Sequence, residues 1–245
     1  MTAFVAIGRR YLPLGWSDLL RQLAIWFGFL FTYQLARGLA DRNPAKAFEN
    51  GLGVVSLEKH VHGLFELTLQ RITINSHLLT TLTSWTYWLS QFTVLGLALL
   101  WVYLRRHEHF ARFRNTILLA NLIGLIGYVA LPTAPPRMFP QLGFVDTIAT
   151  FGINHGSGFV QLASNQFAAM PSLHSADALI VGVTLAFIVK RWVFKILWLL
   201  WPAWVWFSVM ATANHFWLDV VAGVAVAALA VAILNWPRIL RAVRA

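Results

Sequence analysis

His215 and Asp219 have the side-chain types and the spacing to act together as a nucleophile or a base. They are four residues apart in the stretch 213–223, so on an α-helix both side chains lie on one face, within hydrogen-bond reach. A carboxylate that accepts from one imidazole nitrogen fixes the tautomer and leaves the other nitrogen with a free lone pair. The alternative is a polar pair that only holds neighbouring helices together.

A second histidine lies at the start of another expected helix. The stretch 169–177 places a proline and Ser172 before an apolar run, which predicts a helix start with Ser172 as N-cap. Free N–H groups at such a start favour an anion, and His174 lies in the first turn. Upstream, three prolines in the stretch 131–137 fix the backbone before Arg137, whose guanidinium suits phosphate. Contact of Arg137 with lipid headgroups is the alternative.

Together these side chains describe phosphoryl transfer through a phosphohistidine. In this hypothesis His215 attacks phosphorus, Asp219 steadies the imidazolium, and His174 protonates the leaving oxygen. Arg137, Ser172 and the backbone N–H groups at the helix start hold the phosphoryl oxygens. The chemistry needs no metal and no other cofactor.

The composition indicates the scaffold that must position these residues. The 245 residues are 58% hydrophobic and 11% charged, with a mean hydropathy of +0.65, whereas soluble domains carry about 25% charged residues. We expect an all-α integral membrane protein, a six-span helical bundle that forms one domain over residues 1–245, with a catalytic core at about 115–236. The apolar segments that approach the length needed to cross a core of about 30 Å are roughly 19–40, 77–104, 115–132, 175–190, 194–213 and 216–236.

The basic residues predict the orientation of the chain. A net charge of +10 could suggest nucleic acid, but the basic residues lie in short clusters between apolar runs, as orientation signals do. With the N-terminus cytoplasmic, thirteen of the 19 Lys and Arg residues lie inside. We therefore expect a multi-pass protein of the bacterial cytoplasmic membrane with both termini cytoplasmic, the catalytic groups at the extracytoplasmic face and no nucleic-acid partner.

Two long segments lie outside in this topology. The helical pattern within residues 41–76 predicts one or two amphipathic helices on the membrane surface, between the first and second spans. A short helix that packs on the protein is the alternative. Residues 132–174 are rich in Pro, Gly and polar side chains, which predicts an irregular loop facing water or a cavity. Asp177, three residues after His174, either contacts that imidazole or is an acidic residue favoured in the first helical turn.

Three motifs of the chain are Pro-Thr-Ala-Pro-Pro-Arg (132–137), Met-Pro-Ser-Leu-His (170–174) and Asn-His-Phe-Trp-Leu-Asp (214–219). Together they resemble the type 2 phosphatidic acid phosphatase superfamily, and more narrowly its branch related to inositol phosphorylceramide synthase. The resemblance covers roughly residues 115–236 and the segment Leu57–Gln70. It implies a six-span bundle with an extracytoplasmic active site, in which His215 is the nucleophile, His174 the acid and Asp219 the orienting group.

The chain departs from this family pattern where phosphate-binding cations are expected. The first motif of the superfamily has a Lys where this chain has Ala130, and Met138 follows Arg137 in place of a proline. The third motif begins Ser-Arg, and here the corresponding residues are Ser208 and Val209. Two of three expected cations are therefore missing. Since a phosphomonoester carries about −1.5 to −2 charges and a phosphodiester carries one, we expect a phosphodiester lipid as substrate, with headgroup transfer to an alcohol acceptor.

Two other functions stay open at this point. The chain could be a phosphomonoesterase for polyprenyl phosphate or phosphatidate, with cations such as Lys59 or Arg42 refilling the site. It could also be a non-catalytic carrier or scaffold that binds a phosphorylated lipid headgroup through the same residues. The sequence names neither the lipid nor the acceptor, and it gives no basis for predicting an oligomeric state.

Overall fold

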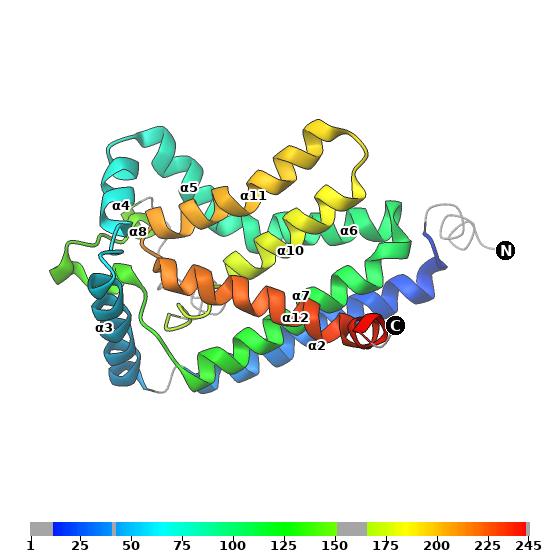
Figure 1. Cartoon of the computed structure of the whole chain (residues 1–245), viewed down its shortest axis with the longest axis horizontal. Coiled ribbons are helices and arrows are strands. Elements are labelled where there is room, and N and C mark those ends of the chain that lie inside the picture. Colours follow the sequence, from blue (N-terminus) through cyan, green and yellow to red (C-terminus); the bar gives the residue numbers. More distant parts are fainter. Residues whose placement is uncertain (1–11, 41–42, 151–165, 244–245) are drawn as a thin grey trace.

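The computed structural model describes residues 12–40, 43–150 and 166–243, and within these residues the protein is all-helical. The only extended pairing in this part of the chain is one parallel bridge between Thr133 and Ala168. The longer helices run along the length of the molecule (Figure 1). They are α2 (Gly15–Ala40), α5 (His77–Leu89), α6 (Leu95–Arg105), α7 (His107–Ala130), α10 (Leu173–Ile188), α11 (Trp192–Ala211) and α12 (Trp217–Val243).

Four helical segments of the described chain are long and apolar enough to cross a membrane. They are His77–Arg105, His107–Ala130, Trp192–Ala211 and Trp217–Trp236, and the apolar helix Leu173–Ile188 is shorter. The first of them is continuous because α5 and α6 are joined by η1 (Ser90–Val94), a π-helical turn. The predicted all-α membrane architecture is therefore confirmed, whereas the count of six spans stays a prediction.

The apolar core lies between α6, α7, α10 and α12. Val102, Ile117, Val181 and Ala230 represent these four helices in it, and each is at most 2% exposed. The outer helix α11 differs, because it leaves large apolar side chains exposed; Trp192, Phe194, Leu197, Leu199 and Leu200 are examples. Such a surface is normal for a helix solvated by lipid and unusual for one solvated by water.

Two shorter helices, α3 (Pro44–His60) and α4 (Glu66–Ile74), lie at one end of the molecule, and α2 begins and α12 ends at the opposite end (Figure 1). Helix α3 begins at a capped turn, where Asn43 accepts from the backbone N–H of Lys46 and Pro44 takes the first helical position. Its buried face packs on loops between the spans; the cluster contains Ala47, Val54, Val55, Ala134, Phe139, Phe144, Ala213 and Phe216. This contact favours the packing alternative for residues 41–76.

Candidate active site

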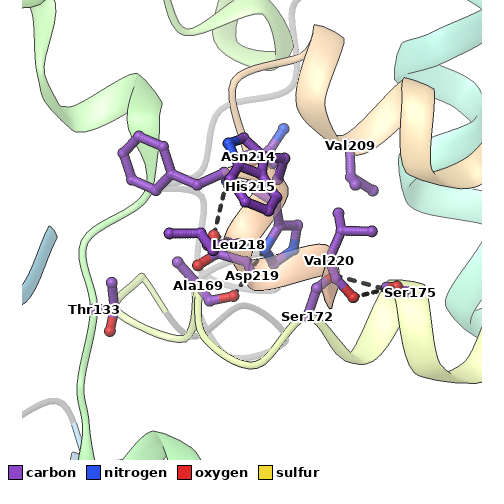
Figure 2. Close-up of polar contacts among 12 residues, drawn as sticks. Thr133, Ala169, Ser172, Ser175, Val209, Asn214, His215, Leu218, Asp219 and Val220 are labelled. Carbon is purple, nitrogen blue, oxygen red and sulfur yellow. Dashed lines mark hydrogen bonds and ion pairs between the residues drawn. The ribbon is translucent and has the colours of Figure 1, made fainter. Parts of the chain in front are cut away.

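The start of α10 is bound to the first turn of α12. The N–H of Ser172 donates to the carbonyl of Asp219 at 2.9 Å, and the Ser175 hydroxyl donates to the carbonyl of Val220 at 3.0 Å (Figure 2). The two helices approach closely because residue 223 is a glycine: a methyl group there would overlap the carbonyl oxygen of Ser172. This contact places His174 of α10 beside the α11–α12 turn.

Ser172 is the N-cap of α10, as the sequence predicts. Its side chain accepts from the N–H of Ser175 at 3.3 Å, and the residue is fully buried. The hydroxyl is therefore engaged in the cap, and a direct contact of Ser172 with substrate stays a prediction.

The two histidines of the predicted site lie next to each other. The ring centroids of His174 and His215 are 5.6 Å apart, and the rings are inclined by 60°. Tyr87 of α5 stacks on the other side of His174, with a centroid distance of 4.6 Å and an interplanar angle of 20°. Tyr87 and His174 are 87 positions apart in the chain, and His174 and His215 are 41 apart. The three rings nevertheless lie next to one another.

The tautomer of His215 is set by a backbone carbonyl. Nδ1 of His215 lies 2.8 Å from the carbonyl oxygen of Ala169 and 3.5 Å from Oδ2 of Asp219 (Figure 2). Because a carbonyl can only accept, Nδ1 carries the hydrogen and Nε2 keeps the lone pair. The sequence assigned this orienting role to Asp219 alone. In the structure Ala169 is the nearer acceptor, and Asp219 Oδ2 also accepts from the N–H of Phe216 at 2.8 Å.

Arg137 is held by the turn between α11 and α12. Its N–H donates to the carbonyl of Ala213 at 2.8 Å, and its Nη1 donates to Oδ1 of Asn214 at 2.6 Å. The turn itself is tight, since Ala213 adopts a positive φ of 56° and the Asn214 amide donates to Thr212. The Arg137 side chain is 7% exposed, and its Nε lies 3.8 Å from Oδ2 of Asp146. A carboxylate therefore already offsets part of its charge.

Both histidines and Arg137 line a cavity of about 80 Å³. Two lining residues, Gln91 and Phe92, come from the π-helical turn η1, a type of distortion that is frequent at functional sites. Sequence reasoning missed these residues, because no simple residue pattern marks a π-helical turn. The remaining described residues of the lining are Tyr33, Tyr87, Trp88, Tyr128, Pro135, Gln166, Ala168, Ala169 and Asn214.

Arg137 is the only Lys or Arg among the described residues that line the cavity. Val209, which replaces the family's arginine, is fully buried in an apolar cluster with Val205 and Val220. Lys59 is exposed to solvent and does not line the cavity. Arg42 lies outside the described residues. The described site therefore has one cation.

Asp177 does not pair with His174 in the described contacts. Its Oδ1 accepts from the side-chain amide of Asn121 on α7 at 2.8 Å, and the residue is 2% exposed. The carboxyl thus joins α10 to α7, and contact with the imidazole is not the interpretation that the structure favours.

The longer described helices are apolar, and two histidines, an aspartate and an arginine lie near one small cavity between them. This arrangement is that of a helical membrane protein with a polar site. The sequence pattern of the PAP2 superfamily matches residues 52–233, and the chain belongs to this superfamily.

Two proteins illustrate the relationship. The chain is 30% identical over 139 residues to the phosphoinositol dihydroceramide synthase of Bacteroides thetaiotaomicron. This alignment covers 51% of this chain and 45% of that protein. It is 29% identical over 120 residues to the inositol phosphorylceramide synthase of Candida albicans. This second alignment covers 42% of this chain and 24% of that protein. The matches therefore span less than half the length of each relative. No solved structure matches the chain. The expected superfamily and its inositol phosphorylceramide synthase-like branch are confirmed.

Proposed function

We propose that this protein is a membrane enzyme that cleaves a phosphodiester lipid through a phosphohistidine and transfers the phospho-headgroup to an alcohol. The observation that carries the proposal is a cavity lined by two histidines and a single cation among its described residues. Arg137 supplies at most one positive charge, part of which Asp146 offsets. This charge is closer to the one negative charge of a phosphodiester than to the about −1.5 to −2 charges of a phosphomonoester. The names of the two relatives, both synthases of inositol-containing ceramides, agree with this preference.

In the first half-reaction Nε2 of His215 forms a bond to phosphorus while the bond from phosphorus to the leaving alcohol's oxygen breaks. His174, in its protonated form, gives its proton to that oxygen, and a bound anion beside the ring favours this form. Asp219 stabilises the positive charge that develops on His215. General acid catalysis of this kind is worth about 10²–10⁴-fold.

In the second half-reaction the neutral His174 takes a proton from the acceptor hydroxyl. The acceptor oxygen then bonds to phosphorus as the bond to His215 breaks, which restores both imidazoles to their starting states. Arg137 stays on the phosphoryl oxygens throughout, and the positive end of α10 adds to the field that it supplies. Water in place of the alcohol gives hydrolysis by the same steps.

The membrane topology belongs to the same proposal. We infer six spans, cytoplasmic termini and a catalytic site at the extracytoplasmic face, in one domain with its catalytic core at about 115–236. The positive-inside distribution of Lys and Arg supports this orientation. The position of α3 and α4 at the end of the molecule opposite the start of α2 and the end of α12 is consistent with it.

A headgroup-release screen tests the proposal. Purified protein in detergent is given diester lipids (phosphatidylinositol, phosphatidylethanolamine) and monoesters (phosphatidate, polyprenyl monophosphate), with and without a ceramide or diacylglycerol acceptor. We expect a diester to lose diacylglycerol, faster with a ceramide acceptor, which gains the phospho-headgroup; with water as the acceptor the phospho-headgroup is released free. Neither reaction should occur in His215→Ala. Faster cleavage of the monoesters would instead establish the phosphomonoesterase. Binding of labelled lipid without any release by the wild-type protein would establish a carrier or scaffold.

A further inference from the structure

Helix α12 begins with three backbone N–H groups that each meet a carboxylate from a different residue. The N–H of Phe216 donates to Asp219 at 2.8 Å, that of Trp217 donates to Glu66 at 2.7 Å, and that of Leu218 donates to Glu58 at 3.1 Å. The first N–H groups of a helix have no partner within the helix, and negative charge at this end is favourable. The two glutamates come from α3 and α4, more than 150 positions earlier in the chain.

Glu58 and Glu66 are an unusual pair, because both are fully buried and neither forms an ion pair with a Lys or Arg of the described chain. Their second carboxyl oxygens, Glu58 Oε2 and Glu66 Oε2, have no hydrogen-bond partner in this part of the chain. Buried carboxylates without partners are costly unless they take up protons. A proton on one carboxyl group satisfies a free oxygen, because it turns that oxygen into a donor towards the neighbouring carboxylate.

Burial, together with the neighbouring carboxyl of Glu66, raises the pKa of Glu58 to about 9. Burial also raises the pKa of Glu66. The third titratable group that acts on both is Asp219 of α12, whose negative charge opposes ionisation of the pair. At neutral pH the pair therefore retains a proton. Protonated Glu58 can accept from Leu218 through one oxygen and donate towards Glu66 through the other.

We propose that Glu58 and Glu66 are positioning residues: a proton-sharing carboxyl pair that fixes the first turn of α12 and thereby holds His215 and Asp219 in their reacting geometry. The inference rests on the proposed function, since it gives the pair a purpose in orienting the nucleophile. The residues that the pair holds, Trp217 and Leu218, lie between the nucleophile and its carboxylate in the chain.

The geometry explains why this turn needs support from outside α12. Oδ2 of Asp219 is shared between the N–H of Phe216 at 2.8 Å and Nδ1 of His215 at 3.5 Å. A first turn that loses its partners at Trp217 and Leu218 frays, and the carboxylate then moves with it. A displacement of about 1 Å at a reacting group can cost about 10²-fold in rate. The match of the family pattern begins at residue 52, so it includes both glutamates.

Three variants test the positioning role by kinetics. Glu58→Ala removes the acceptor of Leu218, whereas Glu58→Gln keeps that acceptor and mimics the protonated carboxyl. Glu49→Ala on the same helix removes an exposed carboxylate that pairs with Lys46 and is the matched control. We expect Glu58→Ala to lower kcat by about 10- to 100-fold with KM nearly unchanged, because Glu58 does not line the cavity.

The pH profile separates positioning from a merely structural role. The proton of Glu58 is lost as pH rises through about 9, so wild-type kcat should fall on that side, and Glu58→Gln should retain neutral-pH activity and lose this alkaline decline. Glu49→Ala should behave as wild type. A Glu58→Ala protein with full kcat, or a Glu58→Gln protein with an unchanged alkaline decline, would overturn the proposal.

A measurement without turnover separates failure of this inference from failure of the proposed function. Hydrogen exchange, followed by mass spectrometry in the His215→Ala background, reports the N–H groups of residues 216–219 even if no lipid is cleaved. Glu58→Ala should speed exchange there by at least about tenfold, while Glu49→Ala should not. Equal exchange in the two variants would contradict the cap itself. Faster exchange in Glu58→Ala, together with no turnover by the wild-type protein, would contradict only the proposed function.

Discussion

Helix α11 and the α3–α4 segment face their surroundings in opposite ways. Helix α11 exposes large apolar side chains such as Leu197 and Leu200, which are 56% and 58% exposed. The α3–α4 segment buries two carboxyl groups completely, Glu58 and Glu66. The first arrangement is cheap because lipid solvates apolar groups, and the second is costly unless the buried groups have specific partners. A membrane surface therefore needs only the right composition, whereas the site end needs particular contacts.

Substitution of the proposed nucleophile gives the largest expected difference between the two regions. His215→Ala should lower kcat by about 10⁴-fold or more, because the covalent step is lost. Leu200→Ala, on the exposed face of α11, should leave kcat unchanged. Both can be measured by headgroup release in detergent, with gel filtration to verify folding. Loss of activity in Leu200→Ala comparable to that in His215→Ala would show that the two regions are not separable.

The next largest effect concerns the single cation. Arg137→Ala should reduce kcat by about 10²–10³-fold, as the loss of one preorganised donor does elsewhere. Arg137→Lys should recover only part of this, because an ammonium group cannot keep the hydrogen bond to Asn214 and also offer two parallel donors to phosphate. Measured kcat and KM for the three proteins provide the test. Equal activity of the Lys and Arg forms would argue against a bidentate contact.

Close packing at the site end predicts a smaller effect. Gly223→Ala places a methyl group against the carbonyl of Ser172, and it should destabilise the protein by about 1–3 kcal/mol and weaken activity with it. Gly96→Ala on α6, where nothing lies within 4 Å, should be neutral or stabilise by up to about 1 kcal/mol. Thermal unfolding in one detergent compares the two. A stabilising Gly223→Ala would contradict the close approach of α10 and α12.

The last expected effect is on stability as a function of pH. The pKa of Glu58 is raised from 4.5 to about 9, so above pH 4.5 the unfolded chain releases a proton that the folded protein retains. The free energy of unfolding therefore decreases progressively as pH rises from about 4.5 to about 9. Glu58→Gln removes this titration. Over this pH range the Tm of the variant should therefore fall less than the Tm of the wild type, by several degrees. Parallel Tm curves would show that Glu58 does not keep its proton.

The sequence predicts the scaffold well because lipid imposes strong constraints. Long apolar runs with few charges can only be helices in a membrane, and the helices of the structure occupy the expected segments. Local rules also predict the Ser172 cap, from a polar residue before an apolar run. His215 and Asp219 do lie close together, but His215 is in the turn just before α12, which begins at Trp217. The predicted arrangement of both side chains on one face of a helix is therefore wrong.

The contacts that complete the candidate site could not be predicted, because they involve backbone atoms or distant segments. The sequence does not single out the carbonyl of Ala169, because every residue has a backbone carbonyl. The stacking of Tyr87 on His174 depends on how α5 packs against α10. Glu58 and Glu66 did carry a signal, as acidic residues within a helical apolar pattern, but the pattern alone favoured a surface helix with solvated charges.

The hydrogen bond from Trp217 to Glu66 spans 151 positions, and this has a consequence for synthesis. At about 5–20 residues per second, roughly 8–30 s of translation separate the two partners. During that interval the carboxyl pair has no helix start to bind, so the proposed nucleophile cannot be aligned before α12 has been made. The candidate site is therefore incomplete while the earlier helices enter the membrane.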